Sequence, residues 1–155
     1  SQLYFNSNSN SNSYFQGGTA QMSGTVTISV YSGGGGQGTY NGDVSGSGTI
    51  VVQRLHSGGA LNLGGDNSGY SGTISVLPDG MLNAASATAL GTGTTVVEGT
   101  LGATVDLTGG NIQTAGGSIS NVNNDRTLGS GVTIELTAAG GGLLVVMATR
   151  GPSAG

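Results

Sequence analysis

The chain has 155 residues, which is enough for one domain with a hydrophobic core, and it carries only three basic and seven acidic side chains, for a net charge of −4. So little positive charge excludes the basic surface of a nucleic-acid-binding protein and the polybasic patch that binds a membrane surface. Cysteine is absent, which excludes disulfides and thiolate metal sites, and no apolar stretch is long enough to predict membrane insertion.

Glycine is the prominent residue, with 33 copies against two prolines and no Gly-X-Y period, so the chain is not collagen-like. A disordered Gly/Ser/Asn chain stays open at this point. The chain begins with Ser and carries no signal peptide, so we expect a segment of something larger. The sparse charge gives little repulsion between copies and favours self-association.

Residues 3–18, LYFNSNSNSNSYFQGG, place an alternating Asn/Ser run between aromatic residues. In an extended strand the Asn side chains share one face and the Ser side chains the other. We expect Leu3, Phe5, Tyr14 and Phe15 to anchor the ends in a core, so that residues 1–18 form the first coil of a stack. A mobile linker and the remnant of a protease-cleavable tag are the alternatives.

A repeat follows, in which Gly-Thr precedes a β-branched residue at Gly24, Gly48 and Gly72, each 24 residues apart. A fourth copy begins at Gly93, after a shorter step of 21, and looser copies follow at Gly116 and Gly131. The clearest repeats therefore span residues 24–107, and residues 108–155 read as irregular terminal coils.

Each repeat predicts short strands between glycine-rich turns. In residues 25–30, Val and Ile alternate with Thr and Ser, and residues 104–107 and 132–136 alternate in the same way. Residues 77–80, Leu-Pro-Asp-Gly, predict a turn. No segment shows a helical stripe; the nearest, residues 84–90, is short and uncapped.

A unit of 20–24 residues cannot bury its apolar face alone, but it can do so when stacked on its copies. We therefore predict an all-β fold, a parallel β-solenoid forming one domain over residues 1–155. A sandwich of antiparallel hairpins is the competing interpretation.

Residues 61–107 resemble the autotransporter-associated β-strand repeat of bacterial surface proteins. The resemblance is carried by these positions: Leu61, Leu63, Gly65, Asn67, Tyr70, Gly72, Thr73, Val76, Gly80, Leu82, residues 89–93, Val97, Gly99 and Leu101. It implies a right-handed parallel β-helix displayed outside the cell and brings no catalytic residues. The spacing departs from the pattern after Gly109, and the chain holds no β-barrel translocator.

Carboxylates are the first candidate site. Asp43 and Asp66 occupy equivalent repeat positions, so a stacked pair would serve as acid and base, or would bind Ca²⁺ with Asn41 and Asn67. We favour turn residues instead. The remaining acids are Asp79, Glu98, Asp106, Asp125 and Glu135.

The other polar motifs are weaker. His56, the single histidine, lies beside Arg54 and suggests a surface loop; Asp125-Arg126 suggests a solvated corner pair. Residues 33–36, four glycines, lack the Lys-Ser/Thr of a phosphate loop. We therefore expect no catalytic residue, no metal and no cofactor.

Two surfaces remain as alternatives. Tyr31, Tyr40 and Tyr70 would line a sugar-binding stripe, although packing within the coils is favoured. Thr25-x-Thr27 and Thr92-x-Thr94 hint at the threonine rows of ice-binding solenoids, but residues 50–52 and 74–76 interrupt the pattern.

The chain is therefore predicted to be a structural, non-enzymatic subunit at the bacterial cell surface or outside the cell. We expect it to assemble head to tail through open solenoid ends, with the apolar residues 143–147 near one of them. An adhesin or passenger stalk that binds glycans is the alternative, and a polysaccharide-cleaving enzyme a remote one.

Overall fold

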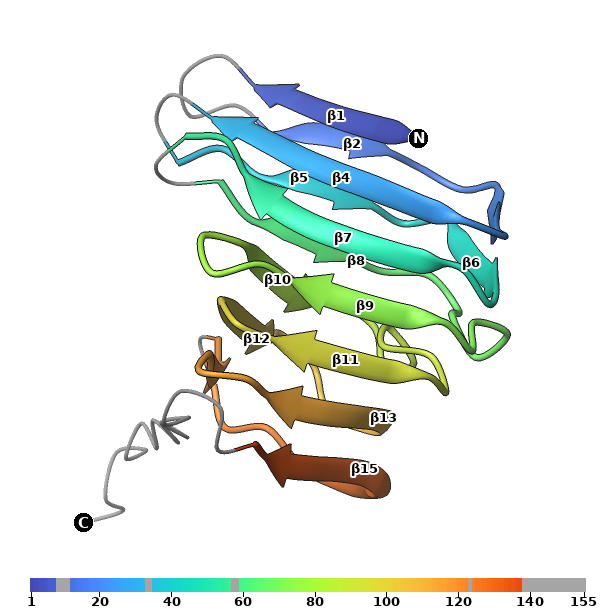
Figure 1. Cartoon of the computed structure of the whole chain (residues 1–155), viewed down its shortest axis with the longest axis vertical. Helices are drawn as coiled ribbons and strands as arrows, with labels where there is room; N and C mark the ends of the chain where they lie inside the picture. Colours follow the sequence, from blue (N-terminus) through green and yellow to red (C-terminus); the bar gives the residue numbers. More distant parts are fainter. Residues whose placement is uncertain (8–11, 33–34, 57–58, 123, 138–155) are drawn as a thin grey trace, which may run out of the picture.

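The computed structural model describes residues 1–7, 12–32, 35–56, 59–122 and 124–137. These residues form an all-β fold without a helix, wound as a parallel β-solenoid of about six turns. Figure 1 shows one sheet in front and a second behind it, with strands running in opposite directions, so that successive turns descend along a right-handed path. The solenoid prediction is confirmed, and the hairpin sandwich is wrong because every strand pair is parallel. The predicted residues 143–147 lie outside the described part of the chain.

Two sheets form the long walls of the solenoid. The front sheet holds, from one end to the other, β1 (Gln2–Ser7), β4 (Thr25–Ser32), β7 (Thr49–Arg54), β9 (Thr73–Val76), β11 (Thr94–Val97), β13 (Leu107–Thr114) and β15 (Leu128–Leu136). The back sheet holds β2 (Ser13–Phe15), β5 (Gly38–Tyr40), β8 (Leu61–Leu63), β10 (Met81–Ala84), β12 (Thr100–Ala103) and β14 (Ser118–Asn121). A third sheet pairs β3 (Thr19–Met22) with β6 (Asp43–Gly46) near one end.

The Gly-Thr repeat sets the register of the front sheet. Thr25 pairs with Thr49, Thr49 with Thr73, and Thr73 with Thr94, so the predicted steps of 24, 24 and 21 residues are turns of the solenoid. The next partner is Asn111 in β13, which replaces the threonine.

Two details of the predicted repeat are wrong. The copy at Gly116 leads into β14 of the back sheet, because the front-sheet strand of that turn has already begun at Leu107. Residues 104–106 lie between β12 and β13 and form a corner rather than a strand. Residues 132–136 do lie in a strand, β15, and residues 77–80 form the predicted turn, in which the Gly80 amide donates to the Leu77 carbonyl over 2.6 Å.

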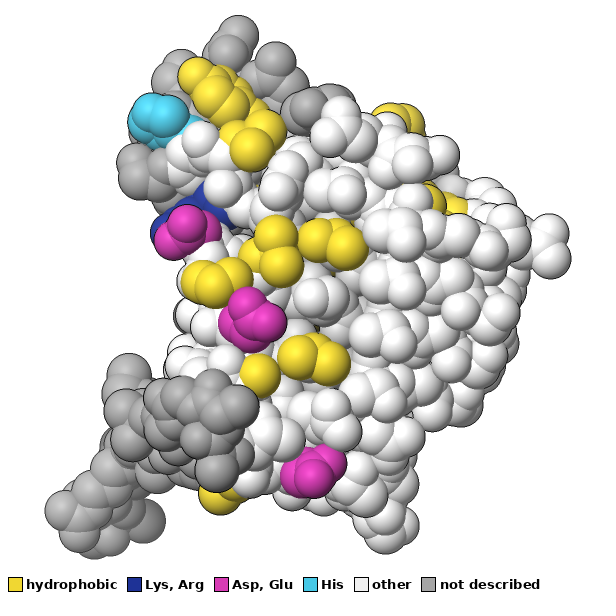
Figure 2. Space-filling view, viewed as in Figure 1, with side chains coloured by type: hydrophobic (Ala, Val, Ile, Leu, Met, Phe, Trp, Pro, Cys, Tyr) yellow, Lys and Arg dark blue, Asp and Glu magenta, His cyan; other side chains and the backbone are white. Residues whose placement is uncertain are grey.

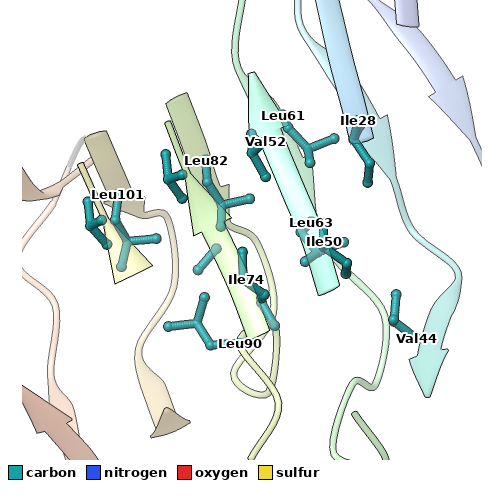
Figure 3. Close-up of a cluster of buried hydrophobic side chains, with 14 of the residues drawn as sticks. Ile28, Val44, Ile50, Val52, Leu61, Leu63, Ile74, Leu82, Leu90 and Leu101 are labelled. Carbon is teal, nitrogen blue, oxygen red and sulfur yellow. The ribbon is translucent and has the colours of Figure 1, made fainter. Parts of the chain in front are cut away.

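The core consists of columns of mostly apolar side chains that continue from turn to turn. Val26, Ile50, Ile74, Thr95 and Ile112 follow one another in the front sheet, and Leu61, Leu82 and Leu101 in the back sheet. Figure 3 shows Ile50, Ile74 and the leucines pointing into the space between the two walls. Because each turn buries its side chains against the turns on either side, the interior turns are the best-packed part of the fold.

The glycine of each Gly-Thr pair has a steric cause. A Cβ atom on Gly48, Gly72 or Gly93 would overlap the carbonyl oxygen of the stacked glycine one turn earlier. Gly24 begins this column, and a Cβ atom there would meet nothing within 4 Å, since no turn precedes it at that place. The pattern therefore reflects close backbone stacking, which only glycine permits.

The N-terminal segment belongs to the stack. β1 pairs with β4 and β2 with β5, as expected of a first coil, whereas the middle of the Asn/Ser run, residues 8–11, lies outside the described residues. Phe5 is buried in the space left by the missing side chain of Gly38. The prediction that Tyr14 and Phe15 are anchored in the core is wrong, since they are 56% and 49% exposed. Tyr14 faces outward beside Thr39, and no strand of the described part of the chain covers Phe15.

Candidate functional surfaces

At the corner that holds Asp43 and Asp66, both carboxylates accept hydrogen bonds from backbone amide groups. The Asp43 carboxylate accepts a hydrogen bond from the Asp66 amide over 2.8 Å, and the Asp66 carboxylate accepts from the Ser68 amide over 3.0 Å and from the Thr88 hydroxyl over 3.1 Å. The bonds from Ser68 and Thr88 hold the pKa of the Asp66 carboxyl below its usual value. Both carboxylates therefore serve the predicted role of turn residues, and each ties its corner to the turn that follows.

Asn67 lies inside the solenoid rather than beside these carboxylates. Its side chain has no exposed surface; the Oδ1 atom accepts from the Val44 amide over 2.7 Å, while Nδ2 donates to the carbonyls of Gly64 and Ala89 over 3.1 and 3.0 Å. One amide thus bridges three successive turns. The alternative Ca²⁺ set is not assembled, because the Asn67 side chain is buried and hydrogen-bonded to the backbone inside the solenoid, whereas Asp43 and Asp66 are exposed.

The same device recurs elsewhere at the corners. Asp106 accepts from the Thr127 amide one turn later, over 2.9 Å, and hydroxyls at the corners and near strand ends donate to backbone carbonyls of neighbouring turns. These donors are Ser86, Thr92, Thr104, Thr108 and Thr137. Among the described residues, no group of three or more His, Cys, Asp or Glu side chains is arranged to hold a metal ion.

The three tyrosines do not form a stripe. Tyr70 is 1% exposed and its hydroxyl lies 2.8 Å from both the Gly48 and Thr73 carbonyls; burial raises its pKa to about 12. Tyr40 is half-buried against the core, and burial, followed by the charge of Asp43, raises its pKa above the usual value. Only Tyr31 stays exposed, with its ring centroid 5.6 Å from that of His56.

The remaining polar motifs lie apart from one another. His56 is exposed on a loop, as predicted. The predicted solvated pair Asp125-Arg126 is wrong in part: Asp125 is exposed, but the Arg126 guanidinium folds back and donates to the Val122 carbonyl over 3.2 Å, leaving its Nε buried. Of the four glycines, residues 33 and 34 lie outside the described residues.

The outer face of the front sheet carries two columns of small side chains. The first column holds Thr25, Thr49, Thr73 and Thr94; the second holds Thr27, Val51, Ser75 and Val96 in the same four turns. We call these eight residues the threonine array. Thr92, which the sequence placed in such a row, lies at a corner and donates to the Tyr70 carbonyl over 3.2 Å. The predicted place of Thr92 in the row is therefore wrong. The predicted interruption is confirmed for the second column, where Val51 and Ser75 stand in place of threonine, while Ile50, Val52, Ile74 and Val76 point inward and leave the first column unbroken.

The ends of the described stack are different in character. Among the described residues, no strand pairs with the outer edge of β1 or of β15. Phe15 at one end, and Leu128 and Leu136 at the other, are 49%, 44% and 59% exposed. Strand edges and apolar side chains are therefore presented together at both ends.

Comparisons with protein-family models, with curated proteins and with solved structures found no match. No helix among the described residues is long and apolar enough to cross a membrane. The function must therefore be inferred from the geometry of the corners, the faces and the ends.

Proposed function

We propose that the chain is a structural β-solenoid subunit that stacks end to end on other copies, building a filament or a surface layer outside the cell. The observation that supports it is the state of the two end turns, where no other strand of the described residues pairs with the outer edge of β1 or of β15. An exposed edge of a flat sheet is a template for pairing with another chain. The extracellular location rests on the resemblance of residues 61–107 to autotransporter repeats.

The apolar side chains at the ends continue the columns of the core. Leu128 and Leu136 pair with Leu107 and Thr114, two buried residues of β13, so they are aligned with the interior. Phe15 pairs with Tyr40, which packs on the core, and also contacts Phe5 edge to face at 5.5 Å. If a second copy were placed with its β1 beside β15 of the first, the same contact would cover Leu128 and Leu136 of the first copy and Phe15 of the second.

Such a contact joins two different surfaces, so it does not close on itself. A head-to-tail contact of this kind, repeated with a small rotation, gives an open fibre rather than a dimer. The net charge of −4 over 155 residues adds little repulsion to oppose it.

Electron microscopy of the purified chain at rising concentration tests this assembly. We expect filaments for the natural chain and their loss in Leu136→Lys, which places a charge on an end side chain that is already 59% exposed and therefore costs little folding energy. Leu55→Lys is the matched control, since Leu55 is 47% exposed but lies on the side of the stack. Dispersed monomers of the natural chain at high concentration, or equal loss in both variants, would contradict the proposal.

Glycan binding is a second candidate, favoured by the exposed rings of Tyr31 and His56. Aromatic faces stack on sugar rings, and these two rings lie at one corner with the exposed Leu55. A glycan array that reports binding by the natural chain and none by Tyr31→Ala would support it. Binding that persists in Tyr31→Ala would place any glycan site elsewhere.

A further inference from the structure

The threonine array has hydroxyl groups with no partner inside the protein. Thr25, Thr27, Thr49, Thr73, Thr94 and Ser75 make no side-chain hydrogen bond within the described part of the chain. Corner hydroxyls behave differently: those of Ser86, Thr92 and Thr104 donate to carbonyls of a neighbouring turn. The hydroxyl groups of the array are therefore available to hydrogen-bond with water or with a ligand that lies on this face.

The array is regular in two directions. Neighbouring strands of a sheet lie about 4.8 Å apart, and residues i and i+2 of one parallel strand lie about 6.6 Å apart on the same face. Because the four turns pair in continuous register without a bulge, both spacings repeat across the array. β-Branched side chains have a restricted χ1 angle, which keeps seven of the eight side chains in place.

The array also carries no charge and no long side chain. Figure 2 shows this face, with acidic and basic side chains toward the left edge and the lower end of the view and an uncharged surface to the right. The nearest charged groups are the Ser1 ammonium, which donates to the Thr25 carbonyl over 3.1 Å at the first turn, Arg54 at the end of β7, and Glu98 directly after β11. A charged polymer such as nucleic acid or an acidic polysaccharide would find no oppositely charged side chain in the array. An uncharged surface could bind to the array without removing water from charged side chains, which is costly.

We propose that the threonine array binds the surface of an ice crystal. Ice presents a flat, uncharged lattice of water oxygens that repeats in two directions over distances of the same order as the two spacings of the array. The free hydroxyls would take up hydrogen bonds with water molecules of that lattice, and the methyl groups of Thr and Val would fill the spaces between them. Burial of many small, pre-ordered side chains at once limits the entropic cost of binding.

This inference does not depend on filament formation, because all eight residues lie on one chain. It predicts that a monomeric form, such as Leu136→Lys, keeps any affinity for ice. Growth along the solenoid axis would only add further arrays.

Ice recrystallisation in a frozen sucrose solution, together with the uptake of fluorescently labelled protein into a growing ice hemisphere, tests the proposal. We expect the natural chain to slow recrystallisation and to enter the ice. Thr73→Tyr, which raises a ring from the centre of the array, should need about tenfold more protein for the same effect, equivalent to about 1.4 kcal/mol of binding. Ser75→Lys, which introduces a charge at the neighbouring position, should act in the same direction.

The matched control is Thr19→Tyr, an exposed threonine of β3 that lies off the front sheet. It should behave as the natural chain does. Circular dichroism and the unfolding midpoint establish that each variant is folded before it is compared. Absence of ice uptake by the natural chain, or equal activity of folded Thr73→Tyr, Ser75→Lys and Thr19→Tyr, would overturn the proposal.

Discussion

Removal of the Asn67 side chain tests how the turns are held together. In Asn67→Ala the Val44 amide and the carbonyls of Gly64 and Ala89 lose their partner in a site with no exposed surface. Each hydrogen bond contributes about 1 kcal/mol, and a buried group left without one costs about 1–3 kcal/mol. We therefore expect a loss of about 3–5 kcal/mol in the free energy of unfolding, a large part of the ~5–15 kcal/mol of a typical domain.

Asn67→Asp separates the role of the donors from that of the acceptor. The substitution keeps an oxygen for the Val44 amide but turns the second atom into a carboxylate oxygen facing two carbonyls. Burial and these carbonyls would raise the pKa of this carboxyl in the folded state above its unfolded value. Since the folded state then binds more protons, the free energy of unfolding should rise as the pH falls through the folded pKa.

Urea unfolding followed by circular dichroism measures both variants, at neutral and at acidic pH. Asp66→Asn is the control: it makes the reverse exchange at the next residue, where the side chain is exposed and an amide oxygen can still accept from Ser68 and Thr88. A loss below about 1 kcal/mol in Asn67→Ala, the net value of one hydrogen bond, would refute the view that Asn67 joins three turns.

Three further predictions concern the backbone stacking and two buried hydroxyl groups. Gly72→Ala should lower the free energy of unfolding by about 1–3 kcal/mol or more, because its Cβ overlaps a stacked carbonyl oxygen, whereas Gly24→Ala, with open space around it, should be nearly neutral in the same thermal denaturation. Thr95→Val should raise the free energy of unfolding by about 1 kcal/mol, since the buried Thr95 hydroxyl has no hydrogen-bond partner. A lower thermal unfolding midpoint in this variant would show that the hydroxyl does have a partner. The raised pKa of Tyr70 predicts that stability falls as the pH rises from about 10 towards 12, because only the unfolded state releases the proton there, and that Tyr70→Phe removes this dependence in a pH series of unfolding curves.

The front sheet could be predicted from the sequence because its signal is repeated. Gly48, Gly72 and Gly93 recur for a steric reason, and the alternation in residues 25–30 shows which side chains point inward. The shortened step before Gly93 is visible for the same reason. In β13, Gly110-Asn111 stands in place of the Gly-Thr pair, so the repeat is lost there and this strand could not be recognised from the sequence.

The back sheet and the corners gave no comparable signal. Strands of three or four residues, such as β8 and β12, are too short for a period of two to stand out. Asn67 resembles a turn residue because it lies among Gly, Asp and Ser, and only the path of the corner turns its amide inward. The first column of the threonine array follows from the Gly-Thr repeat, but the second could not be predicted, because Thr27, Val51, Ser75 and Val96 share no residue type and only the strand pairing shows that they are stacked.

The two proposed surfaces use different parts of the second outward column. In its middle turns this column holds Thr27, Val51, Ser75 and Val96, but at the last turns it holds Gln113 and Glu135, whose side chains are joined by a hydrogen bond of 3.0 Å. At the first turn it holds Gln2, paired with Thr27. A copy stacked on β15 in this register would bring its Gln2 next to Glu135 and continue that polar ladder across the junction. Small side chains thus occupy the turns where a flat face is needed, and long polar ones the turns where copies would meet, so Leu136→Lys should impair assembly alone and Thr73→Tyr the binding of ice alone.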